Sequence, residues 1–121
     1  MIPKNKRNKM LGIAEASILG RAVAPPETNE TPAGPVMKIR LAVNERRKNG
    51  EHASFFSVDV WNEKAQAALA SLEKGEILWC HCSVRNEQYE GKNGDKITAT
   101  RFTMDKFRFV SSKQAEESIA A

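Results

Sequence analysis

The sequence predicts an all-β fold in which five strands form a small barrel and one short α-helix lies between the third and fourth strands. Three observations support this prediction. Several segments alternate apolar and polar residues, as half-buried strands do. One of them changes at Asn62 into a segment with the period of an α-helix, and Asn49-Gly50 and Asn93-Gly94 each stand between two alternating segments. Asn-Gly tolerates the positive φ angles of tight turns, so both pairs predict hairpins.

Length, composition and charge are those of one globular domain. The chain has 121 residues, of which 40% are hydrophobic and 28% are charged, and its formal net charge is +4. A basic balance favours a polyanionic partner. No apolar run is long enough to span a membrane, and no secretory signal follows the basic start of the chain. We therefore expect a cytoplasmic protein without a membrane partner.

The first part of the chain is read as an arm, a strand, a loop and a second strand. Residues 1–13 are polar and basic and are expected to form a flexible arm, and residues 14–23 a strand. Residues 24–34 contain three prolines, a composition that predicts a loop. The second strand has the clearest alternation, and its apolar face carries Met37, Ile39, Leu41 and Val43. Its other face is cationic, with Lys38 and Arg40.

The third strand carries aromatic residues on both faces. Its core face has Phe56, Val58 and Val60. Phe55 and Trp61 fall on the opposite face, beside serine and aspartate. Such a face suits stacking on flat, partly hydrated ligands such as bases. Packing against a loop or another subunit is the alternative that this strand alone leaves open.

A short helix follows the third strand. Asn62 is its expected N-cap, and its single apolar stripe includes Ala65, Leu69 and Leu72. Gly75 is expected to take the left-handed conformation that ends the helix. A helix with one apolar stripe must cover an opening in the core.

The remaining segments are two strands joined by a hairpin and a short last strand. Residues 77–85 and 96–103 form the hairpin, residues 106–110 the last strand, and residues 112–121 a polar tail.

The fourth strand carries both cysteines of the chain. Cys80 and Cys82 point the same way along it and are expected to be small buried thiols. A zinc site would need ligands from elsewhere, and His52 and His81 are the only histidines. No metal and no cofactor are therefore expected. Trp79 lies on the opposite strand face and is expected to contact another subunit.

The order of elements is that of the OB-fold, a five-stranded Greek-key barrel whose second and third strands bind oligonucleotides or sugars. These are the two strands whose non-core faces are cationic and aromatic. This coincidence favours a nucleic-acid platform over simple packing for Phe55 and Trp61.

An ordered set of short motifs points to a family. The motifs are Ile18-Leu19-Gly20-Arg21, a proline-rich loop ending in Gly34, Leu41-Ala42-Val43-Asn44, Trp61 followed by Ala65 and Leu72-x-Lys74-Gly75, Val84-Arg85, Tyr89 and Gly94. In this order and spacing they resemble the bacterial and phage single-stranded DNA-binding protein family over residues 14–111. The resemblance implies that Phe55, Trp61 and Tyr89 stack on bases, and that the protein is associated with the nucleoid.

The chain departs from the family pattern at three places. Arg46 stands where the family has a fourth aromatic, and a guanidinium can also lie on a base or hold a phosphate. Phe56 replaces a residue, often histidine, that takes part in subunit contacts. The family's acidic, aromatic tail tip, which recruits other proteins, does not match Ser118–Ala121, so we expect no recruitment of partners through such a tip.

The sequence thus predicts a protein without enzymatic activity that wraps single-stranded DNA around an OB barrel. It would protect the strand during replication, recombination or repair with little sequence specificity. The candidate site residues are Lys38, Arg40, Arg46, Phe55, Trp61, Arg85, Tyr89 and Arg101. A homo-oligomer is expected, with a tetramer ahead of a dimer, because linked sites on one strand increase affinity.

Three alternatives remain open at the sequence level. The strongest of them is an OB-fold replication adapter of primosomal type that acts mainly through protein contacts. Binding of RNA or oligosaccharide is the second, because the fold supports both. An enzyme is the weakest, because the chain has neither a phosphate-binding GxxxxGK[ST] loop nor a nucleophile elbow.

Overall fold

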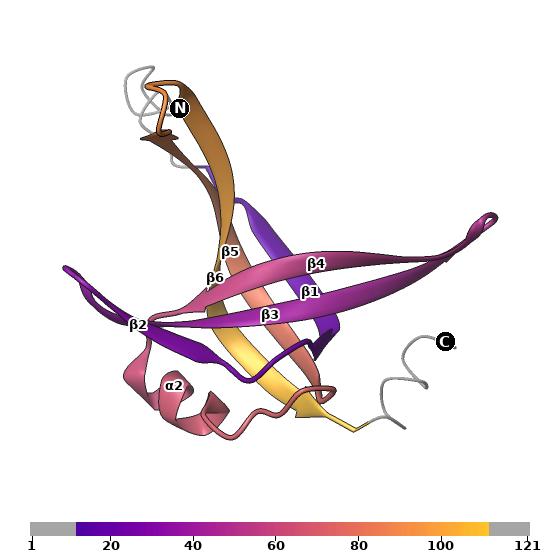
Figure 1. Cartoon of the computed structure of the whole chain (residues 1–121). Helices are drawn as coiled ribbons and strands as arrows, with labels where there is room; N and C mark the ends of the chain where they lie inside the picture. The colour runs from indigo at the N-terminus through magenta and orange to yellow at the C-terminus, as the bar shows by residue number, and fades with distance from the viewer. Residues whose placement is uncertain (1–11, 112–121) are drawn as a thin grey trace, which may run out of the picture.

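The computed structural model describes residues 12–111. Its elements, in chain order, are β1 (Glu15–Ala22), β2 (Glu27–Thr31), β3 (Gly34–Arg47), β4 (Gly50–Val60), α2 (Glu63–Leu69), β5 (Ile77–Glu90) and β6 (Lys96–Val110). The strands form one sheet in the order β1-β5-β6-β4-β3-β2, and an additional pairing of β1 with β3 closes five of them into a ring. Two long hairpins, β3–β4 and β5–β6, extend away from this barrel in different directions (Figure 1).

This arrangement confirms the predicted OB-fold barrel with one helix between its third and fourth barrel strands. The predicted arm, residues 1–13, lies outside the described residues except for its last two, and the predicted tail, residues 112–121, lies wholly outside them. No helix within residues 12–111 is both long and apolar enough to cross a membrane.

The prediction of a loop over residues 24–34 is wrong for its middle part. Glu27–Thr31 forms β2, an edge strand that pairs antiparallel with the start of β3. A turn stabilises this hairpin: Thr31 Oγ1 accepts from the Ala33 amide at 3.2 Å, and Gly34 takes a φ of 112°. Nearly all of β2 is exposed, so its sequence lacks the apolar alternation that reveals a strand.

The predicted break in the last strand is also wrong, because β6 runs without interruption from Lys96 to Val110. Cys82 pairs with Met104 and His81 pairs with Lys106, which leaves Asp105 as the extra residue of a β-bulge. A bulge reverses the side-chain phase of the strand that carries it. The change of phase imitates the end of one strand and the start of another.

The core lies inside the barrel and is closed at one end by α2. Its fully buried side chains include Ile39, Leu41, Val58, Val60, Leu69, Leu72, Leu78, Cys80 and Cys82. The predicted phase of β4 is therefore confirmed, although Phe56 is only partly buried and packs edge-on against Phe102 at 5.6 Å.

Local hydrogen bonds hold α2 in place. Asn62 caps the helix as predicted, because its side chain accepts from the Ala65 amide at 3.0 Å. The Gln66 amide group donates to the carbonyl oxygens of Val60 and Pro35 at 2.9 and 3.0 Å. The helix ends at Leu69, with Ala70 as its C-cap, so Gly75 does not end it. Gly75 does take a positive φ of 92°, in the turn that leads into β5.

Gly20 marks the place where β1 meets β3 and the barrel closes. A Cβ at this position would lie 2.7 Å from the carbonyl oxygen of Ala42, closer than real Cβ atoms approach a backbone atom. The glycine in the Ile18-Leu19-Gly20-Arg21 motif is therefore required by strand packing.

Candidate nucleic-acid interface

The eight predicted site residues share one face of the sheet. Residues that pair across neighbouring strands point to the same side, and so do residues two apart on one strand. The registers Arg40↔Ser57, Asp59↔Thr103 and Arg85↔Arg101 join β3, β4, β6 and β5 in this way. Lys38, Arg46, Phe55, Trp61 and Tyr89 follow in the same phase of their strands. This outer face, opposite to the core, is the candidate interface.

Three aromatic side chains of this face are open to solvent. Phe55 is 53% exposed, Trp61 37% and Tyr89 44%. Phe55 and Trp61 lie six residues apart along β4 and its end, a separation of about 20 Å at roughly 3.3 Å per residue. The guanidinium of Arg40 lies over the Phe55 ring, 5.1 Å from its centroid. The sequence predicted that β3 is cationic and β4 aromatic on this side, but it did not predict this contact between Arg40 and Phe55.

A row of arginines crosses the middle of the face. Arg40 on β3 pairs with Ser57 on β4, and Arg85 on β5 pairs with Arg101 on β6. Arg101 directly precedes Phe102, the partner of Val58, so it lies beside Ser57. We call Arg40, Arg85 and Arg101 the arginine row. Like charges directly opposite each other on a sheet are unfavourable, so an anion above the row would stabilise it.

Carboxylates neutralise parts of the same face. Glu87 Oε2 lies 3.3 Å from Arg101 Nε. Lys38 lies in register between Glu27 on β2 and Asp59 on β4, so both of its cross-strand neighbours are acidic. Strand alternation had placed Asp59 on this face, but sequence reasoning missed its pairing with Lys38. It also missed Glu27 and Glu87, because β2 was read as a loop and the strand registers are not local information.

Two of the predicted residues lie away from the barrel. Arg46 is near the tip of the β3–β4 hairpin, where it pairs with Glu51, and Tyr89 is near the tip of the β5–β6 hairpin, where it pairs with Ile97. The two hairpins diverge from the barrel (Figure 1). Ile97 is an exposed apolar residue of the interface that the sequence analysis missed. Its phase relative to Arg101 on the same strand was the signal that could have found it.

The two cysteines are buried in the core, as predicted, and both are free thiols. Their sulfur atoms lie 3.6 Å apart. The hydrogen bond with Cys82, together with burial, raises the pKa of the Cys80 thiol. Among the described residues, no group of three or more His, Cys, Asp or Glu side chains is arranged to hold a metal ion.

His81 lies in the first half of β5, and its side chain is on the outer side, opposite to the cysteines. Its Nδ1 is 2.8 Å from both carboxylate oxygens of Asp105, and its Nε2 is 3.4 Å from Glu15 Oε2. The hydrogen bond to Asp105 is the main cause that raises the pKa of His81 above its ordinary value, and Glu15 adds to it. Trp79, partly buried, lies on the same side, and its role as a subunit contact stays a prediction.

Comparisons with known proteins identify the family of the chain. The model of the Single-strand binding protein family matches residues 13–110. Single-stranded DNA-binding protein 1 of Lactococcus lactis is 27% identical over 103 residues, which cover 82% of this chain and 69% of the relative. Single-stranded DNA-binding protein 2 of Staphylococcus aureus is 29% identical over 100 residues, which cover 79% of this chain and 71% of the relative.

Solved structures show the same fold. The mitochondrial single-stranded DNA-binding protein Rim1 of Saccharomyces cerevisiae matches with a TM-score of 0.71 and 18% identity, over 84% of this chain and 98% of that one. A Plasmodium falciparum SSB in complex with ssDNA matches with a TM-score of 0.72 and 16% identity, over 85% of this chain and 99% of that one.

Proposed function

Because the chain belongs to the Single-strand binding protein family, we propose that it binds single-stranded DNA on the outer face of β3, β4, β5 and β6. The observation that carries this proposal is the shared face: three exposed aromatics and the arginine row lie on one side of one sheet. The proposed role is to protect single-stranded DNA during replication, recombination or repair.

Base stacking supplies the first part of the binding energy. Phe55, Trp61 and Tyr89 each present a ring to solvent, and stacking contributes about 1 to 3 kcal/mol per base. Every base has a π face, so this contribution depends little on sequence. Arg40 already covers one face of the Phe55 ring, and a base stacks there either on the open face or in place of the guanidinium.

Phosphate contacts supply the second part. The arginine row lies between Phe55 and Trp61, where the backbone of a strand stacked on both rings must pass. Each neutralised phosphate releases counterions, so affinity falls with salt at a log–log slope of about −0.7 per contact on a single strand. Lys38 and Arg46, which have acidic cross-strand neighbours, contribute less to this term.

The hairpins extend the proposed path beyond the barrel. Arg46 and Tyr89 lie on the same face as the arginine row but on different hairpins, so a strand that reaches both bends across the barrel. We also propose that the protein forms a homo-oligomer, a tetramer ahead of a dimer, because linked copies of this face hold one strand more tightly than one copy does.

Fluorescence anisotropy with a labelled oligothymidylate tests the function directly, with duplex DNA and single-stranded RNA as competitors. Trp61→Ala and Phe55→Ala are each expected to weaken binding by about 1 to 3 kcal/mol with unchanged melting temperatures. Ala67→Ser on the exposed side of α2 is the control variant. Equal affinity for duplex and single strand, or unchanged binding in both variants, would contradict the proposal and favour an adapter that acts through protein contacts.

A further inference from the structure

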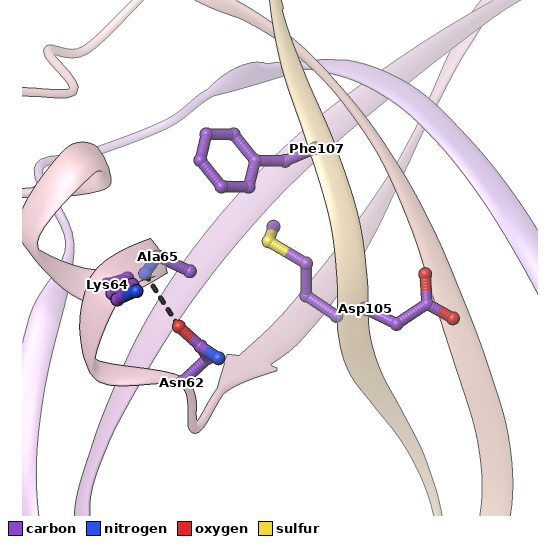
Figure 2. Close-up of a pocket in the computed structure, with 6 residues that line it drawn as sticks. Asn62, Lys64, Ala65, Asp105 and Phe107 are labelled. Atoms are coloured by element: carbon purple, nitrogen blue, oxygen red, sulfur yellow. Dashed lines mark hydrogen bonds between the residues drawn. The ribbon is translucent and has the colours of Figure 1, made fainter.

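A groove with both apolar and polar walls lies between the first turn of α2 and the second half of β6. It has a volume of about 540 Å³ and is lined by Asn62, Lys64, Ala65, Met104, Asp105 and Phe107. The Phe107 ring projects from β6 toward the helix, whereas Asp105 projects to the other side of the strand (Figure 2). Phe109 packs edge-on against Phe107 at 6.0 Å and is 42% exposed, so it continues the apolar surface along β6.

The strand beside this groove has an open edge. β6 pairs with β4 only at Phe102 and Thr103. Beyond Thr103, β5 is the only strand of residues 12–111 that pairs with β6. The other edge of Asp105–Val110 therefore presents backbone N–H and C=O groups without a ladder partner in the described part of the chain. Such an edge is a template for the addition of an extended peptide.

The two sides of this edge differ in chemistry. Phe107 and Phe109 pair with Cys80 and Leu78 and so face the core side. Lys106 and Arg108 pair with residues of the outer side, and both are exposed. A strand added here would place alternate side chains beside phenylalanine and beside a cation. Matched cross-strand pairs would be apolar on the first side and acidic on the second.

We propose that the open edge of β6 and the adjoining groove bind an extended segment of a partner protein in which apolar and acidic residues alternate. Charge selects an acidic partner: Lys64 lines the groove and Lys106 and Arg108 flank the edge. Two acidic residues nearby, Asp105 and Glu15, contact His81 at 2.8 and 3.4 Å. The apolar residues of the segment bury Phe107 and Phe109.

The probe is a fluorescein-labelled synthetic peptide of about eight residues, a usual strand length, that alternates valine and glutamate. Its anisotropy is measured with the full chain, against a peptide of equal composition with the two residue types in separate blocks. The alternating peptide is expected to bind and the block peptide is not. N-methylation of every second peptide amide is expected to abolish binding when these amides face the strand edge. N-methylation of the other set of amides is expected to leave binding unchanged, because those amides point away from the edge. Absence of binding, or equal loss in both phases, would overturn strand addition.

Arg108→Glu tests the charge rule, with Lys96→Glu at the far end of β6 as the matched control. Arg108→Glu is expected to weaken the glutamate peptide by about threefold to tenfold and to favour a peptide that alternates valine and lysine. Lys96→Glu is expected to change neither. Unchanged peptide affinity in Arg108→Glu would overturn the proposal. Peptide binding that appears only after deletion of residues 112–121 would also overturn it, because the chain's own end would then be the occupant of the edge. A changed sedimentation coefficient of Arg108→Glu would overturn it as well, because the occupant would then be a second copy of the chain.

Discussion

Lys38 and Arg40 are cations on the same face of β3, yet we expect them to contribute differently to DNA binding. Lys38 lies between Glu27 and Asp59 in the sheet register. Arg40 has Ser57 as its partner on β4 and lies over the Phe55 ring. The comparison of Lys38→Ala with Arg40→Ala therefore asks whether the local register or the charge alone decides where phosphates bind.

The magnitude follows from the cross-strand distance. A carboxylate about 5 Å from an ammonium group interacts with it by about 1 to 3 kcal/mol for effective dielectric constants between roughly 80 and 20. Two acidic neighbours in register lower the positive potential around Lys38 in the free protein, so a phosphate gains less there than at Arg40. Arg40→Ala is expected to reduce the log–log salt slope by about 0.7, the value for one phosphate. A fourfold rise in salt then costs the parent about two to three times more affinity than it costs the variant. Lys38→Ala is expected to leave the slope nearly unchanged.

Anisotropy titrations of a labelled oligothymidylate over a range of salt concentrations measure both slopes. Thermal melting of each variant shows whether the barrel is intact, and Glu27→Gln is a further test, because it should raise the contribution of Lys38. Equal slope changes for Lys38→Ala and Arg40→Ala, with both barrels intact, would refute the argument from register.

Three further predictions follow from single contacts. Glu87→Gln frees Arg101 from its ion pair and should tighten DNA binding by up to about fivefold with a steeper salt slope, and unchanged affinity would contradict this. Phe56→Ala should lower the free energy of unfolding in urea by about 2 to 3 kcal/mol, less than the 3 to 5 of a fully buried phenylalanine, because Phe56 is only partly buried; a loss near zero would contradict this. Asp105→Asn should lower the pKa of His81, measured in an NMR titration, and an unmoved His81 pKa would contradict this. A folded-state pKa above the ordinary value of 6.5 stabilises the fold below that value, and this stabilisation is lost as pH rises through the folded-state pKa. The variant should therefore lose less stability than the parent over that rise in pH.

What the sequence predicted well is local in origin. The phases of β3 and β4 follow from alternation over a few residues, and the side chains of Val58 and Val60 are buried as that alternation requires. The Asn62 cap follows equally from the residues beside it. Within one strand, phase also predicts which residues share a face, as it does for Lys38 and Arg40 on β3 and for Phe55 and Trp61 along β4 and its end.

What the sequence could not predict depends on pairing between distant segments. β2 is exposed on both faces and is recognised only through its ladder with β3. The bulge at Asp105 is one extra residue, visible only when β5 is set against β6. The arginine row needs the parallel contact between β4 and β6, which joins residues more than forty positions apart at Val58 and Phe102.

The same long-range registers show why net charge is a weak guide to the binding surface. The formal charge of +4 is a difference between 19 basic and 15 acidic residues, and the outer face contains both kinds. Where register sets a carboxylate beside a cation, as at Lys38, the field that a phosphate meets is small. Where it sets arginines around a serine, as at Ser57, the field adds. Reversing the charge of a residue far from Ser57 would change the net charge by as much as Arg40→Glu, yet by this argument it would barely change DNA affinity at moderate salt, because screening removes contributions beyond about 10 Å.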